Sequence, residues 1–467
     1  ALGLACLLLA AALPLSGAQK DATLQASDSK MSAVGAWVDA YLTQHLPPLS
    51  GHSILRVPGS QAALIIGGAA PGNHSQESEM GGAAFVEGFG PGENQSLSSM
   101  YTHTSLARQS AVWATPAPGV PAETNALVEF GGVPAPGSPT DAVRVTWFRN
   151  DSADGGSHFY RMEGYSSDVR TGPTRPPPRA GHAALFDGIR GRMLVWGGQI
   201  GATTVTGNLW DVWQLEFGYE KMATESPQWE LTGNWSALRV GSPSLPSGRE
   251  DHTMVTVGPG QGKESDFSVM FGGRGEGTAL GDAWLFSSSG TAEGWWEPIT
   301  IASSQDGAPS GRSGHAAAAL GDWRMVVAGG GGFGFDAWLL TLDPPTGACL
   351  TVGGCGPRGS WVRLSPAGEV PLGFNQLAMA SLGGGSLLVQ GWRDDASSQY
   401  EASLWRLTID QLPPRAAPAP APAPAADPSQ CPGLPYVPGA VLPFCAPEEG
   451  ADAKCDSSEA HECWRSC

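Results

Sequence analysis

The sequence predicts an all-β fold, a six-bladed β-propeller in which an N-terminal strand closes the last blade. The 467 residues include 65 glycines and 39 prolines and only 15% charged residues, a composition that suits many short strands joined by turns. A short apolar run that ends in a double glycine recurs at intervals of roughly 57 to 75 residues, a period typical of propeller blades. The last repeat lacks a fourth strand and an unpaired strand-like segment precedes the first repeat, which indicates that the two ends pair to close a ring.

Four of the six repeats open with a strand that carries a histidine, and in the three clear copies an arginine lies three residues before it; the sixth copy, at 371–380, has lost both. The histidines are His52, His182, His252 and His315, and the arginines are Arg179, Arg249 and Arg312. The second copy keeps Arg108 but has Ala111 at the expected histidine position. Because the histidines occupy the same phase in different repeats, we interpret them as structural positions, and we expect no metal site.

The double glycine ends the second strand of each repeat. The copies lie at 63–68, 126–132, 192–198, 267–273 and 324–330, and a sixth copy at 386–392 has lost one glycine. An aromatic strand follows each copy, and its tryptophans are predicted to belong to the blade core: Trp210, Trp284, Trp338 and Trp405. A lone tryptophan opens a further strand: Trp229, Trp296 and Trp361. Residues 329–334 also match G-x-G-x-x-G, but a strand follows them instead of the helix that a dinucleotide-binding loop needs.

This order of strands over residues 36–412 resembles the kelch repeat. The resemblance implies four-stranded blades in which the tryptophan of the fourth strand packs between neighbouring blades. The propeller is shared by galactose-oxidase-like copper radical enzymes, but the chain lacks their tyrosine and histidine cluster and their cysteine-linked tyrosine. Kelch rings that isomerise sialic acids need an acid–base pair, and the adjacent Glu250 and Asp251 are expected to point to opposite faces of a strand. We therefore expect no cofactor and favour a binding module over an enzyme.

Ring closure is predicted from the strands of the last repeat. Three strands are expected, near 376–382, 386–390 and 403–409, before a Pro-Ala run begins. Upstream, the segment AWVDAYLTQHLPP at 36–48 has the layout of the fourth-strand segment SWVRLSPAGEVP. We therefore infer that residues 37–42 complete the sixth blade.

The two ends of the chain indicate a secreted or cell-surface protein. Residues 1–18 are typical of a signal peptide, and an uncleaved membrane anchor is the alternative. Residues 413–430 form a Pro/Ala-rich linker, and 431–467 form a small cysteine-rich disulfide module that the end of the sequence interrupts. This layout is similar to that of extracellular kelch proteins of the attractin type. Membrane attachment through a region beyond residue 467 stays open.

Two further features fit the secretory pathway. Cys349 and Cys355 face each other across a short loop, where a disulfide is expected and two free thiols are the alternative. Four N-x-S sequons are expected in or beside loops, as candidate glycosylation sites: Asn73, Asn94, Asn150 and Asn234.

The predicted function is recognition of a protein or glycan ligand through one loop face of the ring. The net charge of −18 argues against a nucleic-acid partner. The loops at 199–207, 274–281, 331–334 and 392–400 are expected on the binding face, with four candidate contact residues: Arg274, Trp392, Arg393 and Asp394. The alternatives are a carbohydrate-active enzyme, oxidase- or epimerase-like, with a degenerate site, and a structural protein of an extracellular matrix or cell wall.

Overall fold

A computed structural model describes the protein over the ring and leaves gaps at loops and at both ends. The described residues are 34–39, 49–69, 82–87, 96–101, 106–114, 124–134, 137–150, 160–166, 169–201, 207–221, 229–242, 244–258, 267–289, 293–304, 306–331, 335–344, 356–367, 375–394 and 400–412. Within these ranges the chain forms strands and no helix, so none of the described residues form a helix that could cross a membrane.

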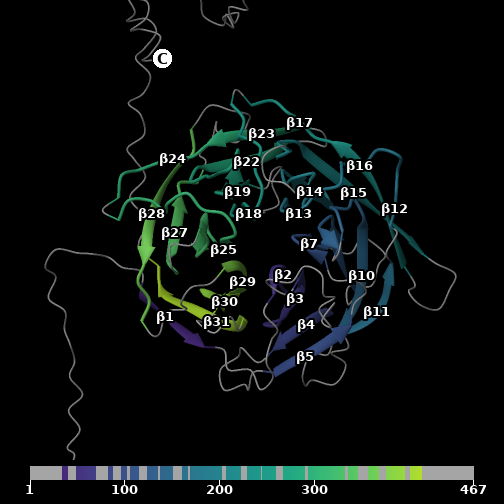
Figure 1. The fold of residues 1–467 in the computed structure, drawn as a ribbon, viewed down its shortest axis with the longest axis horizontal. Coiled ribbons are helices and arrows are strands. Elements are labelled where there is room, and N and C mark those ends of the chain that lie inside the picture. Colours follow the sequence, from purple (N-terminus) through teal and green to yellow (C-terminus); the bar gives the residue numbers. More distant parts are fainter. Residues whose placement is uncertain are drawn as a thin grey trace, which may run out of the picture.

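Six sheets of at least four strands surround a central axis, as the sequence predicts (Figure 1). Blade 1 holds β2 (Ser50–Arg56), β3 (Ala63–Ala69), β4 (Gly82–Glu87) and β5 (Ser96–Tyr101). Blade 2 holds β7 (Ser110–Ala114), β8 (Thr124–Phe130), β10 (Val143–Asn150) and β11 (Tyr160–Ser166). Blade 3 holds β13 (Ala183–Asp187), β14 (Arg192–Trp196), β15 (Val212–Lys221) and β16 (Trp229–Ala237).

The other three blades repeat this antiparallel order. Blade 4 holds β18 (Thr253–Thr256), β19 (Phe267–Phe271), β22 (Ala283–Ser289) and β23 (Glu293–Pro298). Blade 5 holds β25 (Ala316–Gly321), β26 (Arg324–Ala328), β27 (Ala337–Leu342) and β28 (Arg358–Leu364). Blade 6 holds β29 (Asn375–Gly383), β30 (Ser386–Asp394), β31 (Tyr400–Gln411) and β1 (Val34–Asp39).

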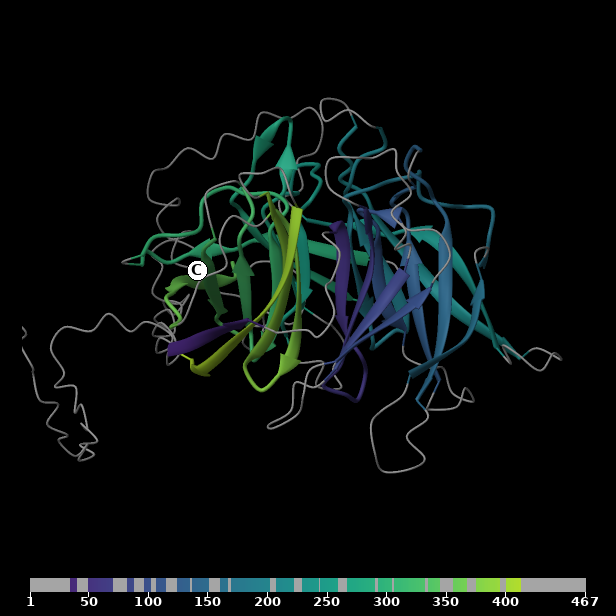
Figure 2. The same cartoon turned by 60° about the horizontal axis from the view of Figure 1, so that its bottom comes forward.

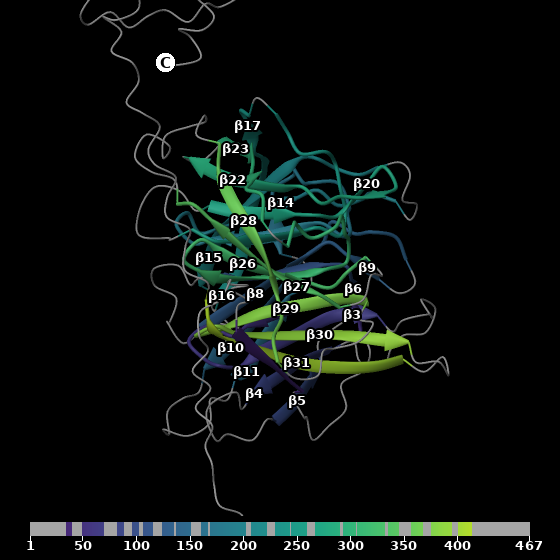
Figure 3. The same cartoon turned by 90° about the vertical axis from the view of Figure 1, so that its left-hand side faces the viewer.

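Short strands complete the sheets. Each of three outer strands gains a two-residue parallel partner: β12 (Arg170–Thr171) on β16, β17 (Arg239–Val240) on β23 and β24 (Thr300–Ile301) on β28. Two small pairs lie outside the blades: β6 (Leu106–Ala107) with β9 (Val133–Pro134), and β20 (Arg274–Gly275) with β21 (Thr278–Ala279). We call the side of the ring that carries the second-to-third strand connections and the blade-to-blade connections the loop face. In Figure 3 the labels of β6, β9 and β20 mark this face on the right.

The N-terminal strand closes the ring, which confirms the predicted closure. β1 runs antiparallel to β31, with Trp37 opposite Leu407 and Asp39 opposite Trp405. The strand covers 34–39, slightly upstream of the predicted 37–42. Blade 6 therefore contains residues from both ends of the propeller.

Burial follows the position of a strand within its blade. All five residues of β14, of β19 and of β26 are buried, because the second strand is covered on both faces by neighbouring blades. The first strands of blades 2 and 3 alternate instead between buried and half-buried residues. This difference explains why the apolar run before each double glycine is the clearest signal in the sequence.

Tryptophans of the fourth strands pack between blades, as the resemblance implies. Trp296 lies 5.3 Å from Trp196 of the preceding blade and Trp361 lies 5.1 Å from Phe271, measured between ring centroids. In blade 3 the equivalent residue is Trp235, whose ring lies 4.8 Å from Phe130. Trp229 opens β16, as predicted, but it is not the residue equivalent to Trp296 and Trp361.

The tryptophans of the third strands also required a correction. Trp338 is buried, and Trp284 and Trp405 are half-buried. Trp210, however, is 62% exposed, and the equivalent residue of blade 3 is Trp213, in register with Val195. Trp210 belongs to the connection before β15 and not to the blade core.

Several predictions fall outside the described residues. These are the signal segment 1–18, the linker 413–430, the cysteine-rich module 431–467, Cys349, Cys355, Asn73 and Asn94. Of the other two sequon residues, Asn150 ends β10, and Asn234 is exposed within β16 opposite Glu216. Asn234 therefore lies in a strand and not in a loop.

Candidate functional site

A buried arginine in blades 3, 4 and 5 holds the start of the third strand. In blade 4, Arg249 donates from Nη1 and Nη2 to the carboxylate of Asp282 at 2.5 and 2.8 Å, and from Nη1 to the carbonyl oxygen of Gly272 at 3.0 Å. The indole Nε1 of Trp284 donates to the same carboxylate at 2.7 Å. Blades 3 and 5 repeat the arrangement with Arg179, Asp211 and Trp213 and with Arg312, Asp336 and Trp338. The arginines are structural repeat positions, as predicted.

The histidines form a second repeated joint, between successive blades. The ring of His182 packs on Phe130 of blade 2, and its Nε2 is 2.7 Å from the Ser110 hydroxyl. His315 packs on Phe271 of blade 4 in the same way, with Nε2 2.9 Å from the Thr253 hydroxyl. His252 contacts Trp196, its ring centroid 4.7 Å away and nearly perpendicular.

Burial keeps these imidazoles neutral. It lowers the pKa of His52 to about 4 and those of His182 and His315 to about 3, and for the latter two the nearby arginine charges act in the same direction. Burial also lowers the pKa of His252 well below its usual value, with Arg249 as the next cause. We find no cluster of three or more metal-binding side chains in the part of the chain that the structure describes.

The double glycine leaves room for this joint. Gly272 and Gly273 both have a positive φ, of 65° and 101°. A Cβ on Gly272 would lie 2.7 Å from the Arg312 carbonyl oxygen and 2.7 Å from the His315 ring, and one on Gly273 would lie 2.8 Å from the His252 Cβ. The glycines therefore allow two blades to approach closely, in addition to turning the chain.

Blade 2 departs from the pattern in a way that sequence spacing did not reveal. In blade 3, His182 lies against Gly131 of the preceding blade. In blade 2 the equivalent residue, which lies against Gly67, is Gln109, and Arg108 is equivalent to Gly181. Arg108 is therefore not the counterpart of Arg179, and the expected histidine position is not Ala111. The place of Arg179 is filled by Leu106, whose carbonyl oxygen faces Gly67 as that of Arg179 faces Gly131.

Six residues with positive φ surround the axis at the loop face, one from each blade. They are Gly51, Arg108, Gly181, Asp251, Gly314 and Gln376. Backbone hydrogen bonds join successive members, from the N–H of Arg108 to Gly51, Gly181 to Arg108, Asp251 to Gly181 and Gly314 to Asp251, at 2.7 to 3.1 Å. At blade 6 the donor to the Gly314 carbonyl oxygen is the N–H of Leu377, the residue after Gln376. Blades 6 and 1 are joined by a side-chain hydrogen bond from the Ser50 hydroxyl to Gln376.

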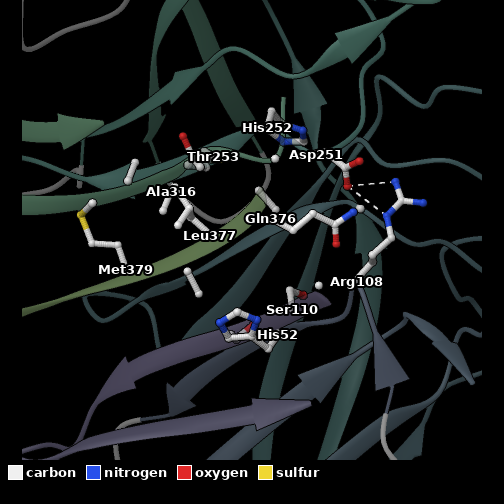
Figure 4. A pocket seen from close by; sticks show the side chains of 18 of the residues that line it. His52, Arg108, Ser110, Asp251, His252, Thr253, Ala316, Gln376, Leu377 and Met379 are labelled. Carbon is white, nitrogen blue, oxygen red and sulfur yellow. Dashed lines mark hydrogen bonds and ion pairs between the residues drawn. The ribbon is translucent and has the colours of Figure 1, made fainter. Parts of the chain in front are cut away.

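These residues form the mouth of a central cavity of about 250 Å³ (Figure 4). The first strands of the six blades line it, with Arg108, Asp251 and Gln376 at the mouth and apolar residues such as Met379 farther along. The cavity is therefore polar at the loop face and largely apolar beyond it.

Arg108 crosses the mouth from blade 2 to blade 4. Its Nε and Nη2 donate to Asp251 at 3.0 and 2.9 Å, and Nη2 also donates to Glu250 at 2.5 Å. Gly181 of the intervening blade makes room, because a Cβ there would lie 2.5 Å from Arg108 Nη2. Burial acts to lower the pKa of Arg108, but Asp251 and Glu250 outweigh it and raise the pKa above its usual range.

The same network includes the predicted contact residue Arg274. Arg274 lies on the loop face as expected, but its Nε and Nη2 donate to Glu250 at 3.0 and 2.8 Å. Glu250 and Asp251 thus converge on Arg108, which contradicts the prediction that they point to opposite faces. Asp251 has a φ of 51°, so it does not follow the alternation of an extended strand.

The other three predicted contact residues lie in a strand. Trp392, Arg393 and Asp394 are the last residues of β30, paired in register with 402, 401 and 400 of β31. The sequence placed them in a loop because the lost glycine of this repeat obscured where the strand ends.

Sequence reasoning missed three exposed apolar side chains in the loop-face connections of blades 3 and 4. Ile200, Trp210 and Leu245 are exposed by 45%, 62% and 43% and all lie in loop-face connections. Gln199 pairs with Asn208 across the connection of blade 3, and Arg249 donates its backbone N–H to Leu209, which places the segment that contains Leu245 nearby. We call Ile200, Trp210 and Leu245 the apolar trio.

A projecting hairpin lies beside the trio. It consists of β20 and β21 with the exposed Glu276 at its turn, and it stands above the ring in Figure 2. The Asn208 amide donates to the Arg274 carbonyl oxygen at 3.1 Å, which connects the hairpin to the chain segment that contains Trp210.

Comparisons with known proteins agree with this architecture. Residues 148–348 match the family model described as the KLHDC2/KLHL20/DRC7 Kelch-repeats domain. A stretch of 176 residues is 30% identical to an F-box/kelch-repeat protein of Arabidopsis thaliana and covers 36% of this chain. The chain matches about a third, 31%, of the length of that relative.

The matches among solved structures are looser and more distant in sequence. One is a chain of a RAG complex with one melted and one unmelted RSS, with a TM-score of 0.46 and 12% identity over 79% of this chain and 99% of that one. Another is a protein of unknown function from Dyadobacter fermentans, with a TM-score of 0.43 and 13% identity over 80% of this chain and 98% of that one.

Proposed function

We propose, from the premise that this chain is a kelch-repeat β-propeller protein, that it binds a partner protein on the loop face beside blades 3 and 4. The observation that carries the proposal is the distribution of exposed apolar side chains. Four large ones are exposed in the described part of the chain, and three of them form the apolar trio on this one face. Exposed apolar side chains grouped with polar neighbours are typical of protein-binding surfaces.

The polar network at the axis gives this surface a rigid base. Glu250 is fully buried and holds both Arg108 and Arg274, so the hairpin beside the trio is fixed to the mouth of the cavity. A rigid surface loses little conformational entropy on binding, which favours affinity. The apolar character of the trio favours a protein over the glycan that the sequence also allowed.

Replacing Trp210 by alanine tests the proposal. We expect the loss of such an exposed aromatic anchor to weaken partner binding by about 2 kcal/mol or more, which is roughly 30-fold. The stability of the Trp210→Ala variant should differ from that of the parent protein by less than about 0.5 kcal/mol, because the Trp210 side chain is solvent-exposed. The measurement is affinity capture with quantitative mass spectrometry, comparing the parent protein with the Trp210→Ala variant.

Ile189 provides the matched control. It is 41% exposed but lies in the turn between β13 and β14, on the opposite face. Proteins whose capture depends on Trp210 and not on Ile189 would support the loop face. If both alanine variants capture the same proteins as the parent, the proposed site is wrong.

We propose further that the module works outside the cell. Support comes from the apolar segment 1–18 and the sequons, of which Asn234 is exposed at the outer strand of blade 3. Expression in a secretory cell line should give a protein in the medium that begins near Gln19 and loses mass on amidase deglycosylation. A protein that stays in the cytosol with residues 1–18 attached would refute this proposal.

A further inference from the structure

The arginines near the axis of the loop face already have carboxylate partners within the chain. Arg108 and Arg274 are bound by Glu250 and Asp251, and the buried arginines of blades 3, 4 and 5 are each bound by an aspartate. These aspartates are Asp211, Asp282 and Asp336. An acidic ligand would have to displace an internal carboxylate before it could pair with any of these guanidinium groups.

The exposed charge next to the apolar trio has the opposite sign. Glu276 is exposed at the turn of the β20–β21 hairpin, and that hairpin is hydrogen-bonded to the segment that contains Trp210. Two exposed arginines also lie in blade-to-blade connections. Arg175 is on the connection that enters blade 3 from blade 2, and Arg239 lies in β17, paired in register with Glu293 of the outer strand β23. The chain as a whole carries a net charge of −18, so its long-range field also attracts cations.

We propose that the partner presents an apolar segment flanked by lysine or arginine residues, the apolar part docking on the trio and a basic residue pairing with Glu276. This inference rests on the proposed function and specifies the chemistry of the ligand. The apolar contact supplies most of the affinity, because rim charges act mainly on the association rate and on specificity. Acidic partners are rejected because the arginines that would attract them are neutralised.

Two displayed peptide libraries test this on the full-length chain. Both have the same randomised apolar centre, and the flanks are three lysines in one and three glutamates in the other. We expect the lysine-flanked library to be enriched at least about 10-fold over the other, with the preference shrinking as salt rises.

Three variants separate a specific site from general attraction to an acidic protein. Trp210→Ala should abolish the enrichment, and Glu276→Lys should reduce it several-fold. Glu293→Lys makes the same change of charge at an exposed position of the outer strand β23 and should leave the enrichment unchanged. If the two lysine variants reduce it equally, the attraction is nonspecific and the inference is overturned.

The remaining outcomes distinguish this inference from the proposed function. Enrichment of glutamate-flanked peptides that depends on Trp210 would leave the loop-face site intact and overturn the basic-partner inference. Peptides of either kind that bind independently of Trp210, or no enriched peptide at all, would overturn both.

Discussion

Lowering the pH from 7 to 5 is expected to destabilise the propeller by about 3–5 kcal/mol. His52, His182, His252 and His315 are buried with lowered pKa values, so the folded ring does not take up the protons that the unfolded chain binds below its pKa of about 6.5. Their stabilising contribution is complete above that pH and falls by roughly 1.4 kcal/mol per pH unit for each histidine.

Two carboxyl groups act in the opposite direction. Burial raises the pKa of Asp251, although the charge of Arg108 opposes this. Burial raises the pKa of Glu129 to about 7, against the opposing charge of Arg144 and a hydrogen bond from Gln109. The folded ring therefore binds this proton between about pH 7 and 4.5 while the unfolded chain does not, and stability rises as the pH falls. The four histidines outweigh these two carboxyl groups, so the net effect of acid is a loss of stability.

Denaturant unfolding midpoints at pH 7, 6 and 5 measure the loss of stability in acid. The His252→Gln variant tests whether the buried histidines cause that loss. Blade 2 already holds Gln109 at the equivalent position, so glutamine is compatible with the joint. The variant should fold and lose about a quarter of the histidine contribution to the pH dependence. A parent protein equally stable at pH 7 and 5 would show that the imidazoles can be protonated within the folded ring.

Replacing Asp282 by alanine is expected to destabilise the ring by about 3 kcal/mol. Arg249 is fully buried and both ends of its guanidinium group bind this carboxylate, so the substitution leaves a buried charge without its counterion. Breaking a buried ion pair by removing one partner typically costs about 3–5 kcal/mol. The Asp282 side chain is 41% exposed, so we expect the loss of stability to lie at the lower end of that range.

Adding Arg249→Leu should restore part of that loss. Blade 2 has Leu106 and Ala142 at the places of Arg249 and Asp282, so the chain already contains an apolar version of this contact. Replacing both members of a buried ion pair by apolar residues is often nearly neutral. Thermal and denaturant unfolding of the parent, the single and the double variant check this, and a double variant less stable than Asp282→Ala would contradict it.

The ring itself could be predicted because its signals are periodic. Each double glycine follows a strand buried on both faces, so its apolar run and the close approach of the next blade recur six times, with one copy degraded. Closure by the N-terminal strand followed from the need to pair the last blade. These features depend on the order of strands and not on the register of single residues.

The errors arose where one residue of register decides the outcome. Trp210 was chosen as blade core, although the spacing Asp-x-Trp of Asp282 and Trp284 recurs at Asp211 and Trp213 and could have identified Trp213. The spacing Gly-x-Trp at Gly294 and Trp296 would likewise have identified Trp235.

The candidate site was less predictable than the fold because it depends on contacts between blades. Arg274 was placed on the correct face, but its pairing with Glu250, and the reach of Arg108 over Gly181, require coordinates. The left-handed backbone of Asp251 turns two adjacent acidic side chains toward one arginine, and no strand pattern indicates this.

The pairing of β1 with β31 has a consequence for synthesis of the chain. β1 leaves the ribosome before any blade exists, while its partner, residues 400–411, is made only after the other five blades. At roughly 5–20 residues per second this interval lasts tens of seconds, during which β1 has no edge to pair with inside its own domain. An unpaired strand of this kind is open to wrong partners. A chain cut short before residue 400 therefore lacks the strand that pairs with β1, and the ring cannot close.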